Sequence, residues 1–234
     1  MKRNPYLNYT RLPMENAYNV RELGGYATKK GSITIHHQFL RSENLTDITE
    51  EDKKIIKEGT VDFYTFSYYM WNCLTVDENA ETTAGNMSKG AKNPYLKASD
   101  WGWQIDPLGL RWCLNWFNDR FELPMMIVEN GFGAYDKKEA DGTVDDQYRI
   151  DYLKEHIQAM KDAVEYDGVD LLGYTMWSPI DIVSASTGEY DKRYGFIYVN
   201  YNNNHEGDFS RSKKKSFDWY KHVIGTNGAC LFED

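Results

Sequence analysis

The sequence predicts an α/β fold with a parallel sheet, and three observations support this prediction. Short apolar or β-branched runs at residues 62–69, 125–130 and 169–177 are typical of buried strands. Segments with helical spacing follow each run. Strands that alternate with helices in this way form parallel sheets with the helices outside. Three such units are too few to close an eight-stranded barrel, so we expect an open sheet edge.

The first two predicted helices have recognisable ends. Pro107 opens one helix and Pro124 stops it, because proline suits a first turn and breaks an interior. Asp145 and Asp146 suit the amino-terminal end of the second helix, which Gly168 closes. Their apolar faces are Leu110, Leu114, Phe117 and Phe121 in the first helix, and Ile150, Leu153, Ile157, Met160 and Val164 in the second.

The tail of the chain predicts a short strand at residues 195–199 and a helix within residues 210–225. The packing face of this helix consists of Phe217, Trp219, Tyr220 and Val223. A basic cluster precedes that face, and we expect it to be a solvated helix end. Its members are Arg211, Lys213, Lys214 and Lys215.

Glu129 ends the apolar run that begins at Met125, and Asn130 and Gly131 follow it. The pattern predicts a buried strand that delivers one carboxylate to its carboxyl end, where the chemistry of barrel enzymes is found. An ordinary acidic turn is the alternative. Residues 71–106 have no strong period, and loops of that length usually carry function.

Composition limits the classes of partner. The net charge of −9 argues against a general nucleic-acid surface, since phosphate backbones need basic stripes. Aromatic residues make up 15% of the chain, which suits either an aromatic core or stacking platforms for sugars. Three widely spaced cysteines predict buried or unreactive thiols rather than disulfides or a zinc site. We see no signal peptide or membrane span and expect a cytoplasmic protein.

Residues 50–228 resemble the carboxyl-terminal part of glycoside hydrolase family 1, in its 6-phospho-β-glucosidase branch. The strings that carry the resemblance are residues 59–63, 66–70, 92–103, 127–131, 174–178 and 192–196. The resemblance implies strands six to eight of a (β/α)8 TIM barrel, which would be incomplete here. We therefore expect residues 51–234 to form a partial barrel.

The same resemblance implies a role for each matching residue. Glu129 matches the catalytic nucleophile, and Tyr69 matches the tyrosine that orients it. Trp177 matches the platform under the sugar ring. For Tyr69 and Trp177, ordinary core packing is the alternative.

Residues that select the substrate lie further along the chain. Ser184, Lys192 and Tyr194 match the phosphate pocket of the phospho-glycosidases, where a hydroxyl, an ammonium and a phenol bind the 6-phosphate. Ala185 resembles the glucoside-preferring members of that branch. A solvated loop in which Lys192 and Arg193 are exposed charges is the alternative.

One part of the family pattern is missing. The acid/base glutamate of the family lies in an Asn-Glu-Pro string, and this chain has none. Asp181, Glu189 and Asp191 are near the site in sequence, but nothing nominates one of them as the acid. Loss of acid assistance alone costs roughly 10²–10⁴-fold in rate.

Residues 15–55 resemble the amino-terminal segment of tyrosine/serine phosphatases. The resemblance lies in residues 19–26, 39–45 and 49–52. Phosphatase activity needs a His-Cys-x5-Arg loop, which the chain lacks, so we reject that activity. We expect residues 1–50 to be a small β-rich appendage rather than an independent domain.

The leading hypothesis is retaining hydrolysis of β-glucosides that carry a 6-phosphate, impaired by the missing acid. No metal or organic cofactor is implied. The alternatives are a non-catalytic sugar-phosphate binder or inert fragment, and a half-barrel that a separate chain completes.

Overall fold

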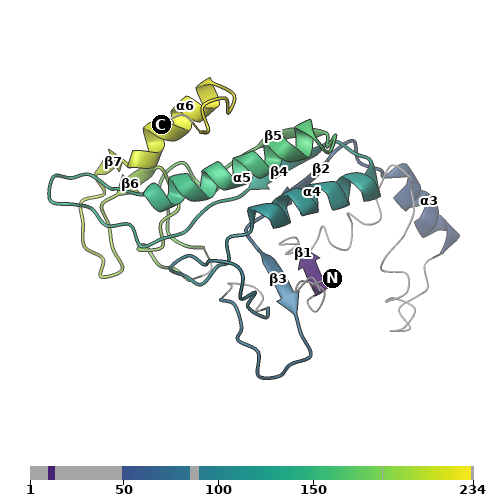
Figure 1. Cartoon of the computed structure of the whole chain (residues 1–234), viewed down its shortest axis with the longest axis horizontal. Coiled ribbons are helices and arrows are strands. Elements are labelled where there is room, and N and C mark those ends of the chain that lie inside the picture. The colour runs from purple at the N-terminus through teal and green to yellow at the C-terminus, as the bar shows by residue number, and fades with distance from the viewer. Residues whose placement is uncertain (1–9, 14–48, 85–89, 186, 233–234) are drawn as a thin grey trace, which may run out of the picture.

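A computed structural model of the 234-residue chain describes residues 10–13, 49–84, 90–185 and 187–232 (Figure 1). In chain order the elements are β1 (Thr10–Pro13), α3 (Glu50–Glu58), β2 (Tyr64–Ser67), β3 (Trp71–Leu74), α4 (Pro107–Phe121), β4 (Met125–Glu129), α5 (Gln147–Glu165), β5 (Leu171–Tyr174), β6 (Ile197–Val199), β7 (Arg211–Lys213) and α6 (Lys215–Gly225).

The three predicted strands form one parallel sheet, in the order β2-β4-β5. Each is connected to the next through a helix, α4 and then α5, as the alternating pattern predicts. β2 and β5 are shorter than predicted. Tyr69 therefore lies two residues beyond β2, and Trp177 lies three residues beyond β5.

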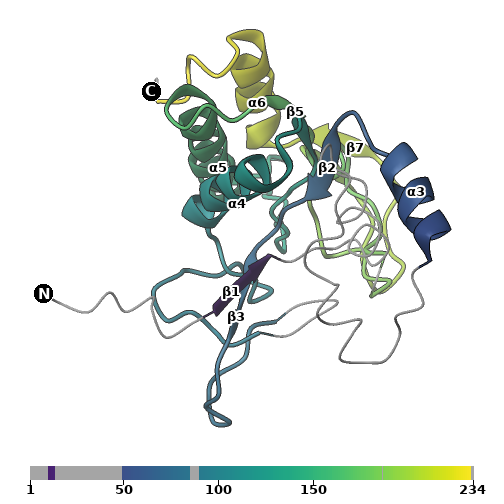
Figure 2. The same ribbon diagram turned by 90° about the vertical axis from the view of Figure 1, so that its right-hand side faces the viewer.

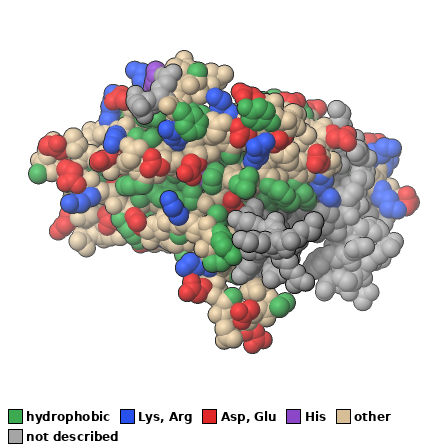
Figure 3. All heavy atoms as spheres, viewed as in Figure 1, with side chains coloured by type: hydrophobic (Ala, Val, Ile, Leu, Met, Phe, Trp, Pro, Cys, Tyr) green, Lys and Arg blue, Asp and Glu red, His purple; other side chains and the backbone are tan. Residues whose placement is uncertain are grey.

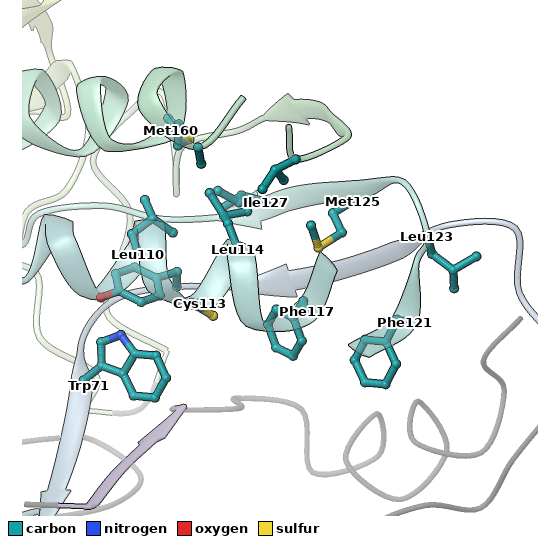
Figure 4. Close-up of a cluster of buried hydrophobic side chains, with 13 residues drawn as sticks. Trp71, Leu110, Cys113, Leu114, Phe117, Phe121, Leu123, Met125, Ile127 and Met160 are labelled. Atoms are coloured by element: carbon teal, nitrogen blue, oxygen red, sulfur yellow. The ribbon is translucent and has the colours of Figure 1, made fainter. Parts of the chain in front are cut away.

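The main core lies between this sheet and helices α4 and α5. Leu110, Leu114 and Phe117 of α4 are fully buried or nearly so against Met125 and Ile127 of β4 (Figure 4). Figure 1 shows both helices on the same side of the sheet. The helical spacing of the apolar residues thus identified the face that packs.

The ends of α4 follow its sequence. The Asp106 carboxylate accepts a hydrogen bond from the Gly109 amide at 2.8 Å, and Pro107 occupies the first turn. Glu122 takes a left-handed conformation with φ of 52° and ends the helix before Pro124. Asp146 begins α5 but makes no capping hydrogen bond there, because its carboxylate instead binds other partners in the interior.

Helix α6 packs through the predicted face. Phe217, Trp219 and Tyr220 contact one buried cluster around Phe196, and Val223 belongs to another. The prediction of a solvated basic cluster was wrong for Lys214, which is 2% exposed. It was also wrong that the cluster begins the helix, since Arg211–Lys213 form strand β7, paired antiparallel with β6.

The segment from residue 71 to residue 106 contains more structure than the sequence predicted. Trp71–Leu74 form β3, which pairs antiparallel with β1 (Figure 2). The rest of the predicted amino-terminal appendage, residues 1–9 and 14–48, lies outside the described residues. Cys73, Cys113 and Cys230 are buried free thiols, as predicted.

Among the described residues, no further strand extends the sheet at either edge, and apolar side chains on its other face are exposed. Val128 of β4 is 39% exposed and Leu172 of β5 is 58% exposed, whereas their neighbours Ile127 and Leu171 pack against the helices. Within the described residues, β2 and β5 each pair with β4 alone. Apolar side chains also gather over the region of α4 and α5 on the face seen in Figure 3. Leu108 and Trp112 of α4 are exposed.

Candidate functional site

Glu129 lies at the carboxyl end of β4, in contact with the neighbouring strand. The register between β2 and β4 shifts after Phe66, and this irregularity sets Ser67 directly opposite Glu129. The Ser67 hydroxyl donates a hydrogen bond to the Glu129 carboxylate at 2.9 Å. Sequence reasoning did not single out Ser67. The signals for it were its place near the end of the predicted strand of residues 62–69 and within the matching string of residues 66–70.

Asn130 anchors the backbone that carries Glu129. Its side-chain amide is fully buried and donates to the Tyr68 carbonyl at 2.6 Å and to the Tyr152 hydroxyl at 2.8 Å. The Tyr174 hydroxyl donates to the amide oxygen at 2.6 Å. Asn130 thus joins the ends of β2 and β5 to α5. A hydrogen-bonded buried amide of this kind holds one geometry, because any other leaves polar groups unpaired.

Two tyrosines lie beside the Glu129 carboxylate. Burial raises the pKa of Tyr69 far above its ordinary value, and the negative charge of Glu129 raises it further. Burial and then the Glu129 charge likewise raise the pKa of Tyr194. Both phenols therefore stay protonated at neutral pH. They can act as hydrogen-bond donors toward an anion.

An aromatic cluster surrounds these tyrosines. Tyr69, Trp101 and Tyr194 are buried together, and Trp177 packs against them half-buried. The rings of Trp101 and Tyr194 meet edge to face with 4.9 Å between centroids. Trp101 comes from the segment that the sequence predicted to be a functional loop. A Cβ at Gly133 would lie 2.1 Å from the Trp101 ring, so glycine is what allows this ring to pack here.

The predicted phosphate-pocket residues lie in one connected segment. Ser184 is buried, and its amide donates to the Glu189 carbonyl at 2.9 Å. The Glu189 carboxylate pairs with the Lys192 ammonium at 2.8 Å. That ammonium also lies 5.1 Å from the centre of the Trp101 ring. Ala185 is exposed.

The structure therefore brings Glu129, Tyr69, Tyr194 and the Trp177 region together with Lys192, through Trp101. Among the described residues, Ser184 is linked to Lys192 through Glu189, and Ala185 is exposed. The alternative of two exposed loop charges is wrong for Arg193, whose side chain is 3% exposed.

The acids near the site in sequence are all engaged with bases. Asp181 pairs with Arg193 and with Lys214, the latter at 2.6 Å, and Asp191 lies 3.5 Å from Arg193. Glu189 holds Lys192. In the described part of the chain, no group of three or more His, Cys, Asp or Glu residues could hold a metal ion. None of the described helices is both long and apolar enough to cross a bilayer.

Comparison with known families gives one match. The sequence profile of "Glycosyl hydrolase family 1" matches residues 17–229. That range includes nearly all of the segment from 15 to 55, so the resemblance of this segment to phosphatases is not supported. The predicted boundary near residue 50 is untested.

Curated relatives extend the match. The chain is 53% identical over 196 residues to "Aryl-phospho-beta-D-glucosidase BglH" of Bacillus subtilis (strain 168), covering 83% of this chain and 42% of that protein. It is 56% identical over 188 residues to "Phospho-cellobiase" of Klebsiella oxytoca, covering 80% of this chain and 40% of that protein. The chain thus spans well under half the length of these relatives.

Solved structures agree on the fold. "Family 1 b-glucosidase from Thermotoga maritima" superposes with a TM-score of 0.72 at 30% identity, covering 92% of this chain and 45% of that one. The same enzyme in complex with castanospermine gives a TM-score of 0.71 over 91% of this chain. The three-stranded sheet and its two helices therefore correspond to part of a larger barrel.

Proposed function

Because the chain belongs to glycosyl hydrolase family 1, we propose that it forms the nucleophile side and the phosphate pocket of an enzyme that hydrolyses β-glucosides carrying a 6-phosphate. One observation carries the proposal. The Glu129 carboxylate, at the carboxyl end of β4, is hydrogen-bonded by Ser67 and faces Tyr69 and Tyr194. The relatives named for phospho-glucosides supply the substrate class.

In the proposed reaction Glu129 is the nucleophile. Its carboxylate attacks the anomeric carbon and forms a covalent ester as the bond to the leaving-group oxygen breaks. A second carboxylic acid protonates that oxygen, and water then hydrolyses the ester with retention. Ser67 and Tyr69 hold the attacking carboxylate in one rotamer, and both can donate to it without adding charge.

Substrate recognition is assigned to the neighbouring aromatic and basic groups. Trp177 covers the apolar face of the sugar ring. The Lys192 ammonium and the hydroxyls of Ser184 and Tyr194 bind the 6-phosphate. The Lys192 ammonium pairs with the Glu189 carboxylate at 2.8 Å, and its three N–H donors allow it to bind a phosphate as well. Ala185 is small and exposed, and its proposed role is to favour glucosides over galactosides as substrates.

The three acids that lie near the site in sequence do not supply an evident acid/base residue. Asp181, Glu189 and Asp191 are each engaged with a base, and the chain has no Asn-Glu-Pro string. We propose that the open sheet is completed by the other part of a family 1 barrel, which carries the acid. A phosphorylated sugar substrate agrees with the expected cytoplasmic location. Binding of sugar phosphates without turnover is the second candidate, and the missing acid favours it.

Hydrolysis of nitrophenyl β-glucoside 6-phosphate by the purified chain tests the proposal. The same assay is run with Glu129→Gln, with the unphosphorylated substrate, and after adding the amino-terminal part of the B. subtilis relative. Turnover that appears with this part, and needs both Glu129 and the phosphate, is expected. Binding of the substrate without turnover in every mixture would favour the second candidate. Absence of binding by a folded chain would refute both.

A further inference from the structure

Lys192 and Tyr194 flank a buried arginine. Alternate residues of an extended segment point to opposite sides. Lys192 and Tyr194 both contact the Trp101 ring, whereas Arg193 points away from it into the interior. The backbone of Arg193 is tied to Ala134 by two hydrogen bonds of 3.0 Å each.

The Arg193 guanidinium holds two backbone carbonyls at once. It donates to the Val199 carbonyl and to the Tyr201 carbonyl, both at 2.7 Å. It lies over the Tyr198 ring at 4.2 Å and contacts the Asp181 carboxylate at 3.3 Å. A planar fork can make these contacts together, and the point charge of a lysine cannot.

Asp181 connects this arginine to a larger buried network. Its carboxylate also accepts from the Gly195 amide at 3.0 Å and from the Lys214 ammonium at 2.6 Å. A Cβ at Gly195 would lie 2.4 Å from the backbone of Ile180. The segment that carries Tyr194 is therefore clamped between residue 134 on one side and residues 180–181 on the other.

The buried part of this network is balanced in charge, and Asp191 contacts Arg193 from its exposed side. Lys214 pairs with Asp136, which pairs with Arg149 at 2.9 Å. Arg149 in turn pairs with Asp146 and donates to the Arg193 carbonyl at 3.1 Å. Burial alone would raise the pKa of Asp136, but the charges of Arg149 and Lys214 outweigh burial and lower it. Three acids and three bases, all at most 3% exposed, thus meet in the described interior.

Buried ion pairs add little net stability, because desolvation offsets their attraction, but they do specify one arrangement of the chain. We propose that Arg193 and Asp181 are positioning residues, which fix the backbone that presents Lys192 and Tyr194 to the substrate phosphate. This inference rests on the proposed function. The Arg193 guanidinium binds the Val199 carbonyl, and the Asp181 carboxylate accepts from the Gly195 amide, so we expect neither side chain to contact the phosphate itself.

The test measures dissociation constants for glucose 6-phosphate and for glucose by tryptophan fluorescence. The ratio of the two constants is the phosphate preference. Charge-assisted contacts to a phosphate predict a preference of roughly 10- to 100-fold in the wild-type chain. Arg193→Lys keeps the charge and loses the fork, so it is expected to lower the preference about 10-fold and to leave glucose binding unchanged. Asp181→Asn should act in the same direction.

Arg111→Lys is the matched control. The Arg111 guanidinium donates two hydrogen bonds to the Asp167 carboxylate, at 2.7 and 2.8 Å, and both residues are far along the chain from the phosphate pocket. This variant should keep the full preference. In a double variant, Lys192→Met with Arg193→Lys should lose less preference than the two single losses combined, because part of the effect of Arg193 acts through Lys192.

The outcomes separate the two proposals. A folded wild-type chain without any phosphate preference would refute the proposed function and this inference with it. A wild-type preference that survives in Arg193→Lys, or losses that add in the double variant, would refute the inference alone. If circular dichroism shows that Arg193→Lys is unfolded, the same comparison is made with Asp181→Asn. If Asp181→Asn is unfolded as well, the network is structural, and this result overturns the inference.

Discussion

The buried imidazole of His156 should make the folded chain less stable to unfolding in mild acid. It lies on α5, fully buried, and its ring stacks on Tyr152 at 3.8 Å between centroids. Its Nδ1 is 2.7 Å from the Tyr152 carbonyl, so that nitrogen is the protonated one and donates. Its Nε2 has no hydrogen-bond partner in the described part of the chain. Burial lowers the pKa of His156 to about 4, from an ordinary value of 6.5.

The direction of the effect follows from proton binding. Between pH 6.5 and about 4 the unfolded chain binds a proton on His156 and the folded chain does not. The free energy of unfolding therefore falls as the pH falls through this range, and it is unaffected by His156 above pH 6.5. Each unit of difference in pKa is worth about 1.36 kcal/mol, so the full loss is about 3 kcal/mol.

Urea unfolding at pH 7.5, 5.5 and 4.5, followed by circular dichroism, measures this loss. His156→Leu removes the titrating group and keeps an apolar side chain in the core. Other acids titrate equally in both proteins, so the difference between their pH profiles isolates His156. The wild-type profile should be steeper than the variant profile between pH 6.5 and 4.5. Parallel profiles would refute the reasoning, because they would mean that the imidazole takes up its proton without leaving the core.

Three further predictions test the site and the core. Ser67→Ala removes the 2.9 Å hydrogen bond to Glu129 and should lower kcat of the assembled enzyme about 10-fold with little change in KM. The reason is that hydrogen bonds to charged groups are worth about 1.5–3 kcal/mol. An unchanged kcat would contradict this role of Ser67. Gly133→Ala forces a methyl group onto the Trp101 ring and should cost about 1–3 kcal/mol in urea unfolding, whereas a wild-type midpoint would show that the ring moves freely. Leu114→Ala, at a fully buried position of α4, should cost about 2–5 kcal/mol in the same assay, and a loss below 1 kcal/mol would contradict the packing of this helix.

Much of the fold was accessible from the sequence because it depends on local patterns. The apolar steps of α4 and α5 identified the faces that pack, and prolines marked the start of α4 and its end. The strand that ends at Glu129 was recognisable from one apolar run followed by a carboxylate and Gly131. These features depend on residues within a few positions of one another, so the sequence records them directly.

The candidate site was accessible only in part. The sequence indicated Glu129, Tyr69 and Lys192 by resemblance, but their roles remain predictions. It did not indicate Ser67, whose contact with Glu129 depends on a register shift between two strands separated by about sixty residues. Register is decided by how whole strands pair, and no local pattern encodes it.

Local patterns in the chain were enough to specify the α/β alternation, the apolar faces of the helices and the end of β4 at Glu129. The burial of Lys214 and Arg193, in contrast, depends on how the whole chain folds. Burying a charge is costly unless opposite charges meet it. The acids that do so, Asp136 and Asp181, come from distant segments, so their meeting is a property of the folded chain and of no single stretch of sequence.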